Sequence, residues 1–347
     1  MTEELLNNHV NIDATDADGD TELMISAAEG YVKSVEALIK NNANLDIVNK
    51  GGETALIKCL NRLHGHHSEH TDLDREIIIK LLINSGSNLE IQSFSGDTAL
   101  TIAANKSRNE IVNTMLLNDV NVDLQNGYGN TAMMLACLNK NIEMVEALFK
   151  ESDGIKIKNN HGATALTIAC LRNDPEIIKF LVENGANCNT QDMDGKTGLM
   201  HVSSLSSSFS EKIEQQQSIE LLLRYGADIN MQDYNGATAL TLCCQHINHR
   251  QHIAAVILLI DNGADYDHKD NQGYCALDYI NKKCDGNSVS MIEKAILSSS
   301  LDADHAQEEV QTSLTDPAKT FADRSALELK KLQARDTERD SELSIGL

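Results

Sequence analysis

The chain has 347 residues, and its 52 Asp and Glu against 29 Lys and Arg give a net charge of −23. An acidic chain without a basic stripe is repelled by phosphate backbones and anionic membrane surfaces, so we expect neither nucleic acid binding nor membrane insertion. No stretch approaches the ~18 to 20 apolar residues of a membrane span, and the first residues lack the basic start of a secretory signal, which predicts a cytoplasmic protein.

A short glycine motif recurs along the chain. In seven of the eight copies a threonine stands two residues after the glycine, and in most copies a small residue and a leucine come next. The glycines are Gly19, Gly52, Gly96, Gly129, Gly162, Gly195, Gly236 and Gly273, with gaps of 33, 44, 33, 33, 33, 41 and 37 residues. A fixed period of this size predicts a stacked-repeat array with three insertions.

Each unit is predicted to contain two helices. The run after the threonine is typical of a short helix with small residues on one side, and a later block places apolar residues at i, i+3 and i+4 on one stripe of a second helix. The second-helix blocks begin at Val35, Ile79, Val112, Val145, Ile178, Ile219 and Val256. One such unit cannot bury both apolar faces alone, so neighbouring units must stack into one elongated domain.

These motifs resemble the ankyrin repeat, whose pattern is D-x-x-G-x-T-P-L-H-x-A-A followed by a second helix and L-L-x-x-G-A-x-x-N. Close copies are DADGDTELMISAAEG from Asp16, NNHGATALTIACLRN from Asn159 and DYNGATALTLCC from Asp233, and eight copies cover about residues 14 to 298. The resemblance implies an all-α ankyrin-repeat solenoid of about eight helix-turn-helix units with β-hairpin turns.

The copies depart from the family at two positions. The proline after the threonine is replaced, mostly by alanine, and the histidine by Met, Ile, Thr or Asp. Because proline restricts the unfolded chain and favours a helix start, we expect each first helix to begin less firmly. We also expect the hydrogen bond between the family's histidine and threonine to be lost.

The same alignment predicts the domain limits. The array spans 1–298, begins with a half-repeat cap at 1–13, and carries insertions near 63–74 and 203–217. Residues 299–347 form a polar, acidic tail with one helix at 316–335. An array followed by such a tail is similar in composition to host-targeted ankyrin effectors of intracellular bacteria, which would place the protein in a host cytosol.

Five cysteines occupy the small-residue positions of first helices: Cys59, Cys137, Cys170, Cys243 and Cys244. We expect buried, reduced thiols there and no disulfide framework.

Two groups of histidines are candidates for metal binding. One insertion contains His64, His66, His67 and His70, and the seventh unit contains His246, His249 and His252 near Cys243 and Cys244. Neither has the spacing of a zinc site, so we expect no metal and no cofactor. No nucleophile elbow, phosphate loop or dinucleotide fingerprint is present, and we expect no enzyme.

The exposed turns remain as the candidate binding surface. Bulky side chains near the turn glycines are Phe94, Tyr128, His161, Met193, Tyr234 and Tyr274. Such residues are enriched among interface anchors, although some could instead fold back onto a neighbouring turn. Asp16, Asp18, Asp20, Glu53 and Asp97 make the first turns acidic, which favours a partner with a basic segment.

The predicted function is therefore a monomeric, non-catalytic scaffold that binds a protein partner through its turns and concave face. The alternatives are a metal-dependent or enzymatic module built from the histidine-rich segments, and a substrate adaptor for ubiquitin ligation. The tail resembles neither an F-box nor a SOCS box, which ranks the adaptor lower.

Overall fold

The structure, a computed structural model, describes residues 11–63, 71–152, 154–205, 211–246, 253–284 and 289–297. The chain divides into two compact units, Met1–Val289 and Ser290–Leu347. The expected cap at 1–13 therefore lies mostly outside the described residues, and the expected tail helix at 316–335 lies entirely outside them. In the second unit the described residues, 290–297, are helical.

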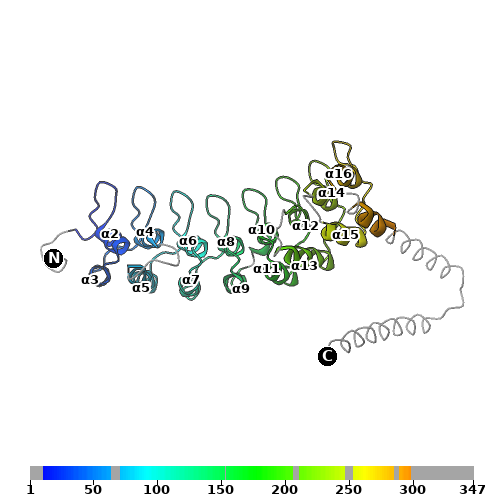
Figure 1. Cartoon of the computed structure of the whole chain (residues 1–347). Coiled ribbons are helices and arrows are strands. Elements are labelled where there is room, and N and C mark those ends of the chain that lie inside the picture. Colours follow the sequence, from blue (N-terminus) through cyan, green and yellow to red (C-terminus); the bar gives the residue numbers. More distant parts are fainter. Residues whose placement is uncertain are drawn as a thin grey trace, which may run out of the picture. The chain divides into compact units, whose positions relative to one another are not determined.

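The first unit is built from pairs of helices arranged in two rows (Figure 1). The first helices of the pairs pack against one another in chain order, and so do the second helices. The first helices are α2 (Glu22–Glu29), α4 (Ala55–Arg62), α6 (Ala99–Asn105), α8 (Ala132–Leu138), α10 (Ala165–Arg172), α12 (Gly198–Ser203), α14 (Ala239–Gln245) and α16 (Ala276–Lys283). The second helices are α3 (Val32–Lys40), α5 (Thr71–Asn84), α7 (Asn109–Leu116), α9 (Ile142–Lys150), α11 (Pro175–Glu183), α13 (Glu211–Arg224) and α15 (Ile253–Asp261), and a 3₁₀ turn, η1, covers Gly154–Lys156.

A five-residue turn precedes each first helix. In every turn the first residue's N–H donates to the fifth residue's carbonyl at 2.9–3.0 Å, and the fourth residue's N–H donates to the first residue's carbonyl at 2.7–3.1 Å. The turns are Asp16–Asp20, Asn49–Glu53, Ser93–Asp97, Asn126–Asn130, Asn159–Ala163, Asp192–Lys196, Asp233–Ala237 and Asp270–Tyr274, numbered 1 to 8 below. These bonds are of the hairpin kind, although no strand is formed in the described residues beyond a single bridge between Thr15 and Thr21.

The chemistry of the turn fixes its residue types. The fourth residue is the repeated glycine, with φ between 73° and 83°, a region that a Cβ atom disfavours. In seven turns the first residue is Asp or Asn, and its side-chain oxygen accepts the N–H groups of the third and fifth residues, as Asn126 does at 3.0 Å each. Turn 3 carries Ser93 at this position.

Neighbouring turns are joined through their backbones. The N–H of the second residue of each turn donates to the carbonyl of the third residue of the preceding turn, at 2.9–3.1 Å. Phe94 to Gly51, Gly127 to Ser95 and Tyr234 to Asp194 are examples. The turns therefore form one hydrogen-bonded row along the same side of the helix pairs, where Figure 1 shows the projecting loops.

Threonine caps the first helices. Thr21, Thr54, Thr98, Thr131, Thr164, Thr197 and Thr238 each accept the N–H of the third helical residue. The family's histidine bond is absent, but three repeats carry threonine at the histidine position. There a hydroxyl pair replaces it, as in Thr164 and Thr167, whose oxygens lie 3.1 Å apart.

This pair gives a first prediction. Thr167→Val should lower the free energy of unfolding by about 1 kcal/mol, because Thr164 is buried and loses a hydrogen-bond partner. Thr114→Val is the matched control, since the Thr114 hydroxyl only donates back to the Glu110 carbonyl of its own helix at 2.8 Å. Urea unfolding of both variants checks this, and an equal loss in the two would contradict it.

Both insertions are partly helical. α5 and α13 each have 14 residues, whereas α9 and α11 each have 9. Residues 71–74 and 211–217 of the two insertions therefore extend the second helices at their N-terminal ends. Residues 64–70 and 206–210 lie outside the described residues.

The core lies between the two rows of helices. The repeated leucine of the first helix is buried throughout the middle of the array, as at Leu56, Leu100 and Leu166. All five cysteines of the sequence prediction are buried, which confirms their expected place in the core.

Candidate partner-binding surface

The row of turns presents large side chains to solvent. Phe94, Tyr128, Met193 and Tyr234 are 82%, 69%, 67% and 70% exposed. His161 is exposed as well, and Tyr274 is exposed less, at 38%. Most residues of the predicted surface therefore stand on successive turns, and whether they contact a partner stays a prediction.

The aromatic residues do not all occupy the same place in the turn. Phe94 and Tyr234 are second residues, and each ring lies against the glycine of the preceding turn. A Cβ atom on Gly52 would lie 2.8 Å from Phe94 Cδ1, and one on Gly195 would lie 2.6 Å from Tyr234 Cδ1. Each ring is therefore held on one side by the neighbouring turn and remains exposed on the other. The expected packing onto a neighbouring turn is found for these two residues, and their contact with a partner stays a prediction.

Tyr274 is engaged by its own repeat. Its ring forms an edge contact with Tyr279 at 5.6 Å between centroids, and Lys282 Nζ lies 3.5 Å from its centroid. Because a cation already covers this ring, Tyr274 has less free surface than the other aromatic turn residues.

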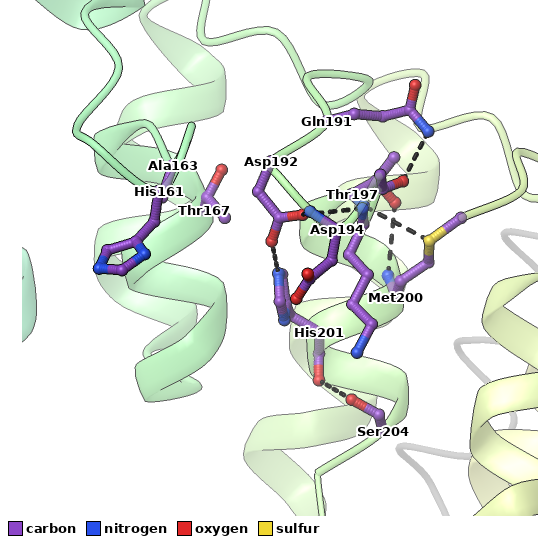
Figure 2. A network of polar contacts seen from close by, with 12 residues as sticks. His161, Ala163, Thr167, Gln191, Asp192, Asp194, Thr197, Met200, His201 and Ser204 are labelled. Carbon is purple, nitrogen blue, oxygen red and sulfur yellow. Dashed lines mark hydrogen bonds and ion pairs between the residues drawn. The ribbon is translucent and has the colours of Figure 1, made fainter. Parts of the chain in front are cut away.

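Below the turns, the first helices contribute a line of side chains on the turn side. Figure 2 shows one of these side chains on α12, His201, whose Nε2 lies 2.6 Å from Oδ2 of the turn residue Asp192. The ring of His161, on the neighbouring turn, points away from this pair. The position equivalent to His201 is Leu135 in α8 and Ile168 in α10. The residues three positions later lie on the same helix face, and these residues, Leu138 and Leu171, are 42% and 45% exposed.

Leu138 and Leu171 form the apolar part of this surface that sequence reasoning missed. Each follows Leu135 or Ile168 by three residues in the repeat, so the register could have found them. They were missed because a leucine at the end of a short helix is usually predicted to lie in the core.

Some acidic side chains of the N-terminal turns form contacts within the array. Lys58 Nζ lies 2.6 Å from Asp20 Oδ2. Burial raises the pKa of Asp20, but hydrogen bonds from Lys58 and Asn49 outweigh it and hold the pKa below its usual value. Asp16 likewise accepts the N–H groups of Asp18 and Asp20. The prediction of a basic partner segment at these turns is not tested by these contacts.

The histidine groups fall largely outside the described residues. His64, His66, His67 and His70 do so, as do His249 and His252, while His246 Nδ1 contacts the Leu242 carbonyl at 2.9 Å. The part of the chain that the structure describes holds no group of three His, Cys, Asp or Glu able to bind a metal ion. Within the same residues, no helix is long and apolar enough to cross a bilayer.

Comparison with known proteins agrees with the fold. The family described as ankyrin repeats (3 copies) matches residues 1–73, 70–161, 108–192, 151–232 and 208–294. This chain is an ankyrin-repeat protein. Ankyrin repeats are in general protein-protein interaction modules.

Two solved ankyrin arrays are similar to this ankyrin-repeat chain. One is the ankyrin repeat domain of Bcl-3, a unique member of the IkappaB protein family, with 22% identity and a TM-score of 0.54 over 70% of this chain and 99% of that one. The other is the human ASB11 ankyrin repeat domain, with 20% identity and a TM-score of 0.55 over 71% and 99%. At these identities the likeness shows the fold alone, and no curated protein sequence matches the chain.

Proposed function

We propose that this ankyrin-repeat protein is a scaffold without catalysis of its own, which binds a protein partner through its turns and the adjoining face of the first helices. This face is the concave face of the sequence prediction. The observation that supports the proposal best is the row of exposed Phe94, Tyr128, Met193 and Tyr234 on a hydrogen-bonded line of turns.

The row has the properties of a binding surface for physical reasons. The backbone bonds between turns hold the side chains in fixed register, so little conformational entropy is lost when they contact a partner. Exposed tyrosine, phenylalanine and methionine supply large contact areas, and interface anchors are enriched in these types. Leu138 of α8 and Leu171 of α10 add exposed apolar side chains on the first helices.

A triple truncation tests the proposal. Tyr128→Ala, Met193→Ala and Tyr234→Ala together should weaken capture of the natural partner at least a hundredfold, since anchors cost ~2 kcal/mol or more when truncated. The readout is affinity capture from the source cell, followed by titration of the captured protein.

The matched control is Tyr31→Ala, Leu117→Ala and Ile213→Ala. These residues are also 58%, 85% and 66% exposed, but they lie at the second helices α3, α7 and α13. We expect the control to bind like the natural chain. Equal binding by all three proteins, or a loss only in the control, would overturn the proposal.

The predicted monomeric state and the likeness to secreted effectors stay predictions, as do the metal-dependent and ubiquitin-adaptor alternatives. No described residue favours one of these over the scaffold.

A further inference from the structure

One turn carboxylate differs from its equivalents in having a buried oxygen without a hydrogen-bond partner. In the seven turns that begin with Asp or Asn, the first residue uses one side-chain oxygen to hold the turn, which leaves its second polar atom for other contacts. In turns 2, 4 and 5 that atom is an amide nitrogen, which donates to the fifth residue of the preceding turn. The pairs are Asn49 to Asp20 at 2.8 Å, Asn126 to Asp97 at 3.0 Å and Asn159 to Asn130 at 2.9 Å.

In turns 6 and 8 the second polar atom of the first residue is a carboxylate oxygen, and its partner lies on the helix that follows the turn. Asp192 Oδ2 lies 2.6 Å from His201 Nε2, and Asp270 Oδ2 accepts the Tyr279 hydroxyl at 2.6 Å. His201 and Tyr279 occupy the same position of their helices, the fourth residue after the cap. The second oxygens of Asp192 and Asp270 therefore both have a hydrogen-bond partner inside the array.

Turn 7 breaks this pattern. Asp233 is 4% exposed, and its Oδ1 accepts the N–H groups of Asn235 and Ala237 at 2.9 Å. Its Oδ2 is buried and has no hydrogen-bond partner. The helix position that holds His201 and Tyr279 in the flanking repeats is Leu242 here, which cannot donate.

The preceding turn offers no partner either. Lys196 is the fifth residue of turn 6, at the place of Asp20, Asp97 and Asn130 in the other repeats. It forms no ion pair with Asp233 in the described part of the chain, whereas Lys58 and Asp20 do pair at 2.6 Å. A buried carboxylate oxygen without a donor costs free energy, which a donor arriving from outside would recover.

We infer that Asp233 is the receptor for an arginine side chain of the protein partner, an inference that rests on the proposed function. The guanidinium group fits because its planar donors match a carboxylate, and because it stacks on aromatic rings. Tyr234 follows Asp233 directly, and its ring is fixed against Gly195 while remaining 70% exposed. Because Asp233 Oδ2 is buried, an arginine reaches it only when the surrounding side chains move apart, and it would do so beside the exposed ring of Tyr234.

The adjacent repeat shows that a cation can lie over a tyrosine of a turn in this array. Lys282 Nζ lies 3.5 Å from the centroid of the Tyr274 ring, although Tyr274 is the fifth residue of its turn and Tyr234 is the second residue of turn 7. The net charge of −23 further favours a basic segment as the ligand.

Peptide selection on the full chain tests the inference. A displayed library of random 12-residue peptides is the probe, and the tightest peptides are then titrated by calorimetry. We expect them to share an arginine. Replacing it by citrulline, which keeps the shape and removes the charge, should weaken binding at least tenfold. Asp233→Asn should weaken the arginine peptide to the same extent, and the two changes together should cost no more than either alone.

Asp233→Asn is a mild change because Asn occupies the same place in turns 2, 4 and 5. Lys196→Met should leave peptide binding unchanged or tighter. If instead Lys196→Met and Asp233→Asn lower the stability to urea non-additively, Lys196 is the counter-ion and the inference is wrong. Equal peptide binding by Asp233→Asn and the natural chain would overturn it as well.

A separate outcome distinguishes this inference from the proposed function. If the peptides are lost on a Tyr128→Ala, Met193→Ala variant but retained by Asp233→Asn, only the arginine site fails. If the natural chain selects no peptide, both fail.

Discussion

Gly96→Ala should destabilise the array by about 4 kcal/mol, roughly two to four times as much as Gly86→Ala. Both glycines have positive φ, 78° and 89°, so both variants carry the strain of a left-handed residue, about 1 to 2 kcal/mol. Only Gly96 lies against backbone. A Cβ atom there would lie 2.5 Å from the Gly127 nitrogen, whereas one on Gly86 would meet nothing within 4 Å.

The difference measures the cost of separating two turns. The Gly127 N–H donates to the Ser95 carbonyl at 3.0 Å, and the clash must displace this bond. Overpacking of this kind costs about 1 to 3 kcal/mol beyond the strain. Urea unfolding and amide exchange at Gly127 are the readouts, with Gly86→Ala as the matched control. Similar losses in the two variants would show that the turns do not rely on close contact.

Raising the pH from 9 to 12 should destabilise the protein steeply through its buried thiols. Burial raises the pKa of the Cys59 and Cys243 thiols from 9.0 to about 12 each. In the unfolded chain these thiols lose their protons near pH 9, whereas in the folded chain they keep them to about pH 12. Unfolding therefore releases protons in this window, and stability falls with pH by about 1.4 kcal/mol per pH unit for each thiol. Below pH 9 the two thiols cause no change.

A double substitution isolates this effect. Cys59→Ala and Cys243→Ala should flatten the decline by about 2.7 kcal/mol per pH unit, at the expense of some stability at pH 7 from lost packing. Both positions lie on first helices at places where other repeats carry alanine, so the fold should persist. Equal slopes in urea titrations at pH 9, 10 and 11 would contradict the assignment of buried, protonated thiols.

The stacked helical array was predictable from the sequence because its signals are local and repeated. The turn glycine needs a positive φ, the threonine caps the helix, and the leucines share one stripe, so each copy supports the same interpretation. The same register predicted the five buried cysteines. The departures from the family were also visible, but their consequence was not, since the Thr164 and Thr167 hydroxyl pair depends on two side chains meeting in space.

The site was predictable only in part. Phe94 and Tyr234 could be placed on turns, but sequence does not show that each ring rests on the glycine of the preceding turn. The exposed Leu138 and Leu171 were hidden among core leucines of similar spacing. Aspartate is an ordinary residue at the start of a turn, so the sequence does not single out Asp233. That its Oδ2 lacks a hydrogen-bond partner is seen only in the structure, by comparison with Asp192 and Asp270, whose equivalent oxygens have one.

Photo-cross-linking tests the central claim of partner binding by the turns most directly. Benzoylphenylalanine is placed at Tyr128, on a turn, or at Leu117, at the end of the second helix α7, and each protein is irradiated with its captured partner. Both positions are well exposed, at 69% and 85%, so neither substitution disturbs the core. The account predicts a covalent adduct from position 128 and none from position 117. An adduct from position 117 alone would contradict it.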